Sequence, residues 1–191
     1  MKKLRLGIMI SGRGSNMRAI VEACRQPDFP AEVVMVISNK GDAAGLVYAH
    51  NCSIETAHVN LKSFEDKDAY EAEITRRFEA MNVDLICLAG YMRILNDSFV
   101  QHWQGRMINI HPSLLPKYKG LNTHQRAIDD GEAEAGCSVH YVVPDLDSGE
   151  VICQAKVAID AGETAESLAT KVLVEEHKLY PHAIKLIAEK F

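Results

Sequence analysis

Three polar side chains in the second half of the chain have the types needed to move an acyl group between two nitrogens. Asn109 and His111 end an apolar run that begins at Met107, and Asp147 follows in the segment 144–149. Residues two apart on an extended strand point to the same side, so Asn109 and His111 are expected to face one site. A carboxamide can donate to an oxyanion, an imidazole can carry a proton, and a carboxylate can orient the imidazole. The three side chains are therefore predicted to be catalytic, without a metal or a covalent intermediate.

Each of these residues also has an ordinary structural interpretation. A strand-end Asn or His often satisfies loop backbone, and an isolated Asp is most often a turn residue. Pro112 and Pro116 hold the chain after His111 in non-helical backbone, at the carboxyl end of a predicted strand. Open α/β sheets bind their ligands at the carboxyl ends of their strands. The position of Asn109 and His111, taken together with a second candidate site elsewhere in the chain, therefore favours a catalytic role over a structural one.

That second candidate is a glycine-rich turn at residues 11–16, between the first apolar run and the first helical pattern. Its glycines let the backbone approach a ligand, and a helix N-terminus attracts anions, although Ser15 or Asn16 could simply cap the helix. As a dinucleotide fingerprint the turn is incomplete, because Met17 holds the third glycine position and the second strand ends without an acid at 38–40. A terminal phosphomonoester is the better prediction. Its candidate residues are Gly12, Gly14, Ser15 and Asn16.

Strand and helix patterns alternate through the first half of the chain, which predicts a mostly parallel sheet. Strands are expected at about 4–10, 31–37, 54–59, 83–89 and 107–110, and helices at about 15–26, 43–51 and 64–81.

The C-terminal part has a different pattern. Two β-rich runs at 138–143 and 150–157 predict an antiparallel or mixed edge, and a last helix at about 164–189 contains Pro181, which is expected to kink or split it. We therefore expect one α/β domain over 1–191, with a Rossmann-like, doubly wound sheet.

Composition excludes several classes of function. The net charge of −5 leaves no basic stripe for nucleic acid, and an aromatic content of 6% offers few stacking platforms. The first apolar run ends at Ser11, which is too short for a signal peptide, and no later run could span a membrane. A cytoplasmic protein is expected, as a monomer or a homodimer.

The five cysteines are widely spaced and contain no C-x-x-C pair, so a zinc site or a disulfide framework is not favoured. Cys87 and Cys153 lie in apolar runs and are predicted to be small core side chains. A nucleophilic cysteine ranks low, because no cysteine lies beside the polar cluster in sequence.

The whole chain resembles the folate-dependent phosphoribosylglycinamide formyltransferases of purine synthesis. The resemblance rests on ISGRGSN at the start, SNKGDAAGL at 38–46, LAGYMRIL at 88–95, INIHPSLLPKYKG at 108–120, the GCSVHYV and DLDSG segments, and EEHKLYP at 175–181. The resemblance departs at Lys119, where a proline is common, and at Asn122, where a histidine is common.

The resemblance implies a role for each candidate residue. Asn109, His111 and Asp147 would be catalytic, and the N-terminal half would bind the ribonucleotide, with its phosphate on Gly14, Ser15 and Asn16. Further ribonucleotide contacts would come from Gly12, Glu176 and Lys67, which stands where an arginine is common. The folate would lie in the C-terminal half and along residues 92–95. Its pocket would be lined by Met92, Arg93, Ile94, Leu95, Val142, Val143 and Asp145.

The implied reaction transfers the formyl group of 10-formyltetrahydrofolate to the amine of glycinamide ribonucleotide. A formyltetrahydrofolate hydrolase would use the same three residues on water, but it needs no phosphate loop. A transferase acting on a sugar nucleotide or an aminoacyl-tRNA is a further alternative, and the acidic charge disfavours tRNA. The last alternative is a non-enzymatic nucleotide-binding module in which His111 has only a structural role.

Overall fold

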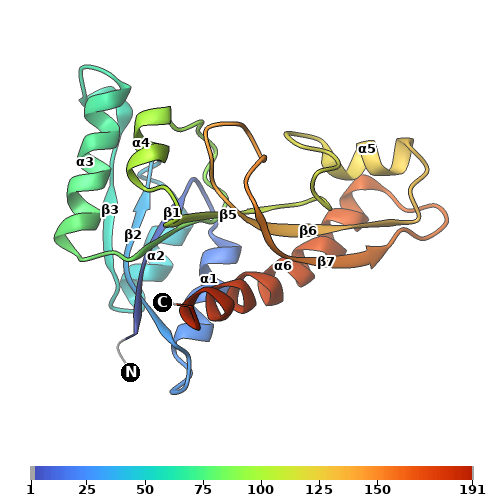
Figure 1. Cartoon of the computed structure of the whole chain (residues 1–191), viewed down its shortest axis with the longest axis horizontal. Helices are drawn as coiled ribbons and strands as arrows, with labels where there is room; N and C mark the ends of the chain where they lie inside the picture. The colour runs from blue at the N-terminus through green and yellow to red at the C-terminus, as the bar shows by residue number, and fades with distance from the viewer. Residues whose placement is uncertain (1–2, 191) are drawn as a thin grey trace.

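A seven-stranded sheet forms the centre of the computed structural model, which describes residues 3–190 (Figure 1). The strand order is β3-β2-β1-β4-β5-β6-β7, with β1 to β5 parallel, and β6 and β7 added antiparallel. The strands are β1 (Leu4–Ile10), β2 (Ala31–Ser38), β3 (Glu55–His58), β4 (Leu85–Leu88), β5 (Met107–His111), β6 (Glu134–Tyr141) and β7 (Val151–Ala158). Met1 and Lys2, which belong to the N-terminal stretch judged too short for a signal peptide, lie outside the described residues, as does Phe191.

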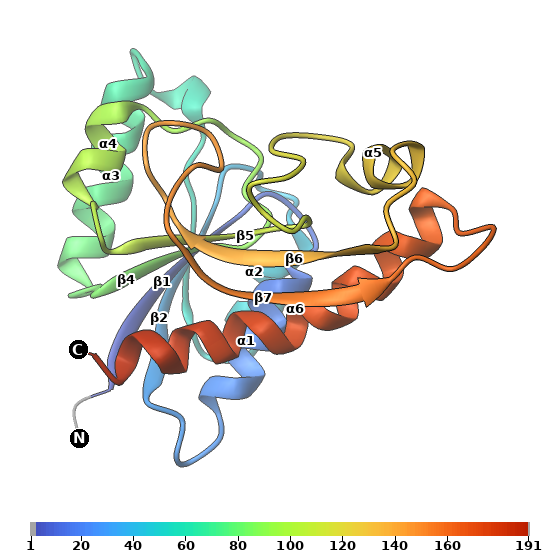
Figure 2. The same ribbon diagram turned by 45° about the vertical axis from the view of Figure 1, so that its right-hand side comes forward.

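Helices cover both faces of this sheet, because its strands are apolar on both sides. Leu6 and Ile8 of β1 pack on the side of α1, α2 and α6, whereas Met9 packs on the side of α3 and α4. Figure 2 shows α6 lying along the sheet beside β6 and β7. The helices are α1 (Ser15–Cys24), α2 (Ala44–Asn51), the 3-10 turn η1 (Leu61–Ser63), α3 (Lys67–Ala80), α4 (Asp97–His102), α5 (Thr123–Asp129) and α6 (Ala165–Ala188).

Helix α3 shows how the sequence produces this layer. The Asp66 side chain accepts the N–H of Ala69 at 2.8 Å and so begins the helix. Tyr70 and Phe78 are buried on the face that meets the sheet. Phe78 lies so close to β1 that a Cβ at Gly7 would come within 2.6 Å of its ring. The glycine in the strand is therefore required for close packing between α3 and β1.

Helix α6 connects the two halves of the sheet. The hydroxyl of the fully buried Tyr180 donates to the carbonyl oxygens of Leu88, at 2.9 Å, and Ile108, at 3.2 Å, on the adjacent strands β4 and β5. Pro181 lies inside α6 without splitting it, so that part of the prediction was wrong. The buried residues on either side, Tyr180 and Ala183, pack against the sheet and stabilise the helix across the missing N–H.

The predicted fold class is confirmed, and the differences are local. The short helices α4 and α5 were not predicted, and β6 begins at Glu134 rather than 138. Within residues 3–190, none of the helices is both long enough and apolar enough to span a membrane.

Candidate active site

Strand β5 presents two of the three predicted catalytic side chains at its carboxyl end. Asn109 is half-buried and His111 is buried. Antiparallel pairing with β6 places His140 directly opposite Asn109 and Ser138 opposite His111. The Asn109 Nδ2 atom lies 3.4 Å from His140 Nε2, so the two strands bring an amide and a second imidazole together.

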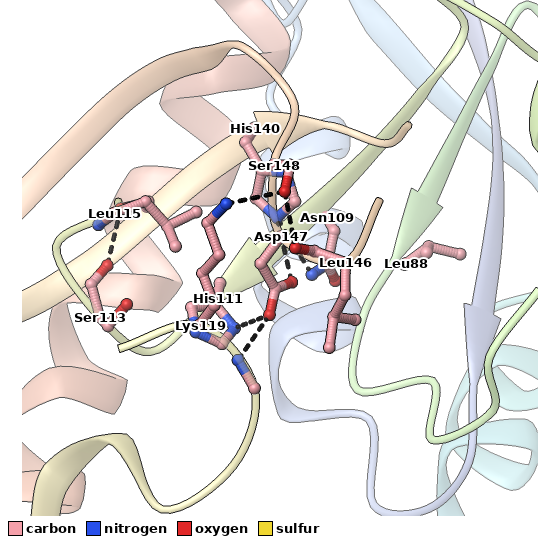
Figure 3. Close-up of polar contacts among 12 residues, drawn as sticks. Leu88, Asn109, His111, Ser113, Leu115, Lys119, His140, Leu146, Asp147 and Ser148 are labelled. Atoms are coloured by element: carbon pink, nitrogen blue, oxygen red, sulfur yellow. Dashed lines mark hydrogen bonds and ion pairs between the residues drawn. The ribbon is translucent and has the colours of Figure 1, made fainter. Parts of the chain in front are cut away.

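Asp147 reaches the same place from the loop between β6 and β7 (Figure 3). Its Oδ2 lies 3.3 Å from His111 Nδ1 and accepts the Gly120 N–H at 2.9 Å, while its Oδ1 lies 3.7 Å from His140 Nε2. The side chains of His111 and Asp147 are each only 7% exposed. Asp147 also has φ 47°, a left-handed conformation that a non-glycine residue rarely adopts. The structure therefore joins the three predicted residues in one buried cluster.

The two imidazoles have different polar neighbours. His111 has an acceptor at each ring nitrogen, the Asp147 carboxylate at Nδ1 and the Tyr118 carbonyl oxygen at Nε2, 2.9 Å away. His140 differs, because its Nδ1 donates to the Tyr141 carbonyl oxygen at 2.8 Å and burial lowers its pKa. His140 is therefore neutral, and its Nε2 lone pair can accept from Asn109.

His140 was not among the predicted site residues. It lies in the GCSVHYV segment, but an isolated histidine in a strand carries no functional signal. The antiparallel register between β5 and β6, which the sequence does not specify, is what places it opposite Asn109.

The glycine-rich turn has a different capping arrangement from the expected one. The residue before α1 is Gly14, with φ 69°, and no side chain caps the helix. The Asn16 Nδ2 instead donates to Glu176 Oε2 of α6 at 2.7 Å, and both side chains are buried. Among the described residues, Asn16 Oδ1 has no hydrogen-bond partner, and burial raises the pKa of Glu176. The capping interpretation of Ser15 and Asn16 is therefore wrong. Two predicted ligand residues, Asn16 and Glu176, are instead hydrogen-bonded to each other.

Close backbone packing shapes this turn. Gly45 of α2 donates its N–H to the Gly12 carbonyl oxygen at 3.1 Å. A Cβ at Gly14 would lie 2.8 Å from Met17 Cε and 3.3 Å from Gly45 Cα. Any larger residue at position 14 would therefore displace the turn from α2.

The segment after β4, where folate contacts were predicted, is exposed but anchored from behind. The side chains of Met92 and Ile94 are 75% and 78% exposed, that of Arg93 is exposed and that of Leu95 is half-buried. Anchoring bonds come from helix α3 and from Ser11, the residue that follows β1. The Tyr91 hydroxyl meets that of Tyr70 at 2.7 Å, Glu71 accepts the Asn96 N–H at 3.1 Å, and Ser11 Oγ accepts the Met92 N–H at 2.8 Å.

The other predicted folate residues lie after β6. Val142 donates its N–H to the Met107 carbonyl oxygen at 2.9 Å, which extends the pairing of β6 with β5 to the amino end of β5. Val142 and Val143 are half-buried and Asp145 is exposed. Leu146, in the same loop as Asp147, is 61% exposed.

Lys67 is paired with a carboxylate of its own helix, α3. Its Nζ is 3.8 Å from Glu71 Oε1, the carboxylate that also holds Asn96. Lys67 is thereby tied to the segment 91–96, and its assignment to the phosphate stays a prediction.

Cysteine chemistry does not contribute to this site. Cys87 is buried as predicted, but Cys153 is only half-buried. Burial raises the pKa of Cys153 to about 11 and that of Cys137 to about 12, so neither is a ready thiolate. Within residues 3–190, no group of three or more His, Cys, Asp or Glu side chains is arranged to hold a metal ion.

The sheet and the buried Asn, His and Asp cluster define a class of protein that comparisons identify. The family described as formyl transferase matches residues 4–184, and the chain belongs to that family. The phosphoribosylglycinamide formyltransferase of Escherichia coli (strain K12) is 43% identical over 95% of this chain and 86% of its own length. The crystal structure of phosphoribosylglycinamide formyltransferase from Brucella melitensis has a TM-score of 0.95 and 48% identity, covering 98% of this chain and 96% of that one.

Longer relatives also match. The trifunctional purine biosynthetic protein adenosine-3 of Bos taurus is 43% identical over 98% of this chain, which spans only 18% of that protein. The similarity therefore concerns one part of the trifunctional protein.

Proposed function

We propose that the protein transfers the formyl group of 10-formyltetrahydrofolate to the amine of N1-(5-phosphoribosyl)glycinamide, a step of de novo purine synthesis. The observation that carries the proposal is the buried cluster of Asn109, His111 and Asp147 at the carboxyl end of β5. The relatives named for this reaction support it, since they align over nearly the whole chain.

The ribonucleotide is proposed to lie between the glycine-rich turn and α6. Its phosphate accepts the free N–H groups at the start of α1, around Gly14 and Ser15, and the macrodipole of α1 favours the negative charge. The Asn16 and Glu176 pair presents an unused amide oxygen and a carboxylate to the polar groups of the ligand. This arrangement favours an acceptor that carries both a phosphate and hydrogen-bond donors.

The folate is proposed to bind between the segment 92–95 and the residues that follow β6. The exposed side chains of Met92, Ile94 and Leu146 offer apolar surface to its ring system. Backbone groups near Val143 and Asp145 offer hydrogen bonds to the ring edge. The formyl group would then lie near Asn109, where the two binding regions meet.

In the proposed reaction, the substrate amine attacks the formyl carbon and a new C–N bond forms. The carbonyl oxygen becomes an oxyanion, to which the Asn109 Nδ2 can donate, while the His111 imidazolium supplies a positive charge. The bond from the formyl carbon to the folate nitrogen then breaks. The leaving nitrogen gains one proton and the attacking nitrogen loses one, so His111 can give the first and take the second, directly or through a water molecule.

Two neighbours prepare these groups for the reaction. Asp147 orients His111 and places a negative charge beside it, and Asp147 is itself held by the Gly120 N–H. Neutral His140 accepts one N–H of the Asn109 amide, so the amide presents its other N–H to the reacting oxygen. His111 must exchange its contact with the Tyr118 carbonyl oxygen to reach the substrate through Nε2.

A turnover assay with different formyl acceptors tests the proposal. The purified protein is supplied with 10-formyltetrahydrofolate and, in turn, glycinamide ribonucleotide, an amino sugar nucleotide, an aminoacyl-tRNA or water alone. We expect rapid release of tetrahydrofolate with glycinamide ribonucleotide only. Equal release with water alone would instead identify a hydrolase.

A further inference from the structure

Ser11 is a buried serine that touches both proposed substrate-binding segments. It directly follows β1 and is 5% exposed. Its Oγ donates to Asn39 Oδ1 at 2.7 Å and accepts the Met92 N–H at 2.8 Å. Its own N–H donates to the Gly90 carbonyl oxygen at 3.2 Å. One residue thereby joins the carboxyl ends of β1, β2 and β4.

The position of Ser11 in the sheet gives these bonds their importance. Strand β1 lies between β2 and β4, where the strand order changes direction, and doubly wound sheets bind their ligands there. Ser11 is the first residue of the glycine-rich turn at 11–16, and its hydroxyl holds the backbone of Met92. The geometry of one segment is thus fixed relative to the other through a single side chain.

The segment around Met92 depends strongly on such an anchor. The side chains of Met92, Arg93 and Ile94 are exposed and contribute little packing of their own. The next anchors along the chain are the Tyr91 hydroxyl, held by Tyr70, and the Asn96 N–H. Of these three anchors, only the hydrogen bond from the Met92 N–H to Ser11 Oγ connects the segment to the glycine-rich turn.

We propose that Ser11 is a positioning residue that sets the folate-binding segment against the ribonucleotide-binding turn and couples the binding of the two substrates. This inference rests on the proposed function for the identity of the ligands. When the ribonucleotide orders residues 12–16, it fixes Ser11 and hence the Met92 backbone, so less ordering remains when folate binds. The coupling is reciprocal, because each ligand stabilises the same arrangement of the shared hydroxyl.

Removing the hydroxyl has a calculable effect. Ser11→Ala leaves Asn39 Oδ1 and the Met92 N–H without their shared partner, and one lost hydrogen bond corresponds to about a 3- to 10-fold change in an equilibrium. We expect the Kd of the folate to rise by about that factor. Ser11→Thr retains a donor and an acceptor and should restore most of the affinity.

Calorimetry on the full chain tests the coupling. The two probes are glycinamide ribonucleotide and an unreactive folate analogue with carbon in place of the reacting nitrogen, each titrated alone and with the other saturating. In the wild type we expect each ligand to lower the Kd of the other. In Ser11→Ala the ratio of the Kd values measured without and with the second ligand should be close to one, and in Ser11→Thr this ratio should return toward the wild-type value. Ser167→Ala is the matched control, since that serine hydroxyl caps α6 at Thr164 and should leave both Kd values unchanged.

A second measurement separates this inference from the proposed function. Hydrogen exchange of the Met92 amide in the free protein should be about 10-fold faster in Ser11→Ala than in the wild type or in Ser167→Ala. Unchanged Met92 exchange, or ligand coupling that survives in Ser11→Ala, would overturn the role of Ser11. Failure of the wild type to bind glycinamide ribonucleotide would overturn the proposed function and the substrate coupling, while the exchange result would still decide whether Ser11 anchors the segment.

Discussion

Replacing Asp147 by asparagine removes a charge from the catalytic cluster while retaining its shape. The new amide oxygen can still accept the Gly120 N–H, whose nitrogen lies 2.9 Å from Asp147 Oδ2 in the wild type, and it can still face His111 Nδ1. The new amide nitrogen then takes the place of Asp147 Oδ1, 3.7 Å from His140 Nε2, whose lone pair accepts from Asn109. The hydrogen bonds can therefore persist in Asp147→Asn, and the main loss is the negative charge beside His111.

The consequences differ for stability and for catalysis. Two unit charges 3.3 Å apart attract by about 5 kcal/mol at an effective dielectric constant of about 20, and desolvation of two side chains that are 7% exposed offsets most of this. His111 can also release its proton in the variant, so we expect the free energy of unfolding to fall by only about 1 kcal/mol. The reaction loses its imidazolium, and turnover should fall by about 100- to 1000-fold.

Two readings on the same samples test this reasoning. Ring ¹⁵N chemical shifts report whether both nitrogens of His111 carry a proton in the wild type and only one in Asp147→Asn. Steady-state turnover at saturating substrates gives the loss of rate, and Asp129→Asn, an exposed acid on α5, is the control. Turnover within 10-fold of wild type, or an imidazolium that persists in Asp147→Asn at about neutral pH, would refute the role assigned to the carboxylate.

Three further changes have distinct expected outcomes. Gly14→Val pushes its side chain into Met17 and Gly45, so calorimetry should show a much larger loss of affinity for glycinamide ribonucleotide than for folate; equal losses would contradict a local phosphate role. Burial raises the pKa of Glu176, so its stabilising contribution is full below the unfolded pKa near 4.5 and is lost as pH rises through the folded value. Denaturation of Glu176→Gln should accordingly show a variant more stable than wild type by about 1 kcal/mol at about pH 8, with no difference at low pH, and a difference that grows toward low pH would reverse the argument. Tyr180→Phe leaves two buried carbonyl groups without their donor, so urea unfolding should show a loss of about 1–3 kcal/mol, and an unchanged midpoint would mean that the bonds are weak.

The parts of the site that lie on regular elements could be predicted from the sequence. Asn109 and His111 share a face because a strand has a period of two, and the prolines after His111 mark the strand end. Strong periodicity likewise predicts α3, where Tyr70 and Phe78 lie two turns apart on one face and are buried.

The remaining parts depend on contacts between distant segments. Asn16 pairs with Glu176, 160 residues further along the chain, and no local rule distinguishes that from helix capping. His140 enters the site through an antiparallel register that leaves no mark on composition. Helices α4 and α5, of 6 and 7 residues, are too short to show a periodic pattern and depend on tertiary packing.

Formation of N-formylglycinamide ribonucleotide from 10-formyltetrahydrofolate, followed in the wild type and in single alanine variants, tests the central claim most directly. We expect turnover in the wild type and losses of about 100-fold or more in Asn109→Ala, His111→Ala and Asp147→Ala, each still folded by circular dichroism. Wild-type rates in two of these three variants would contradict the claim that this buried cluster carries the formyl transfer.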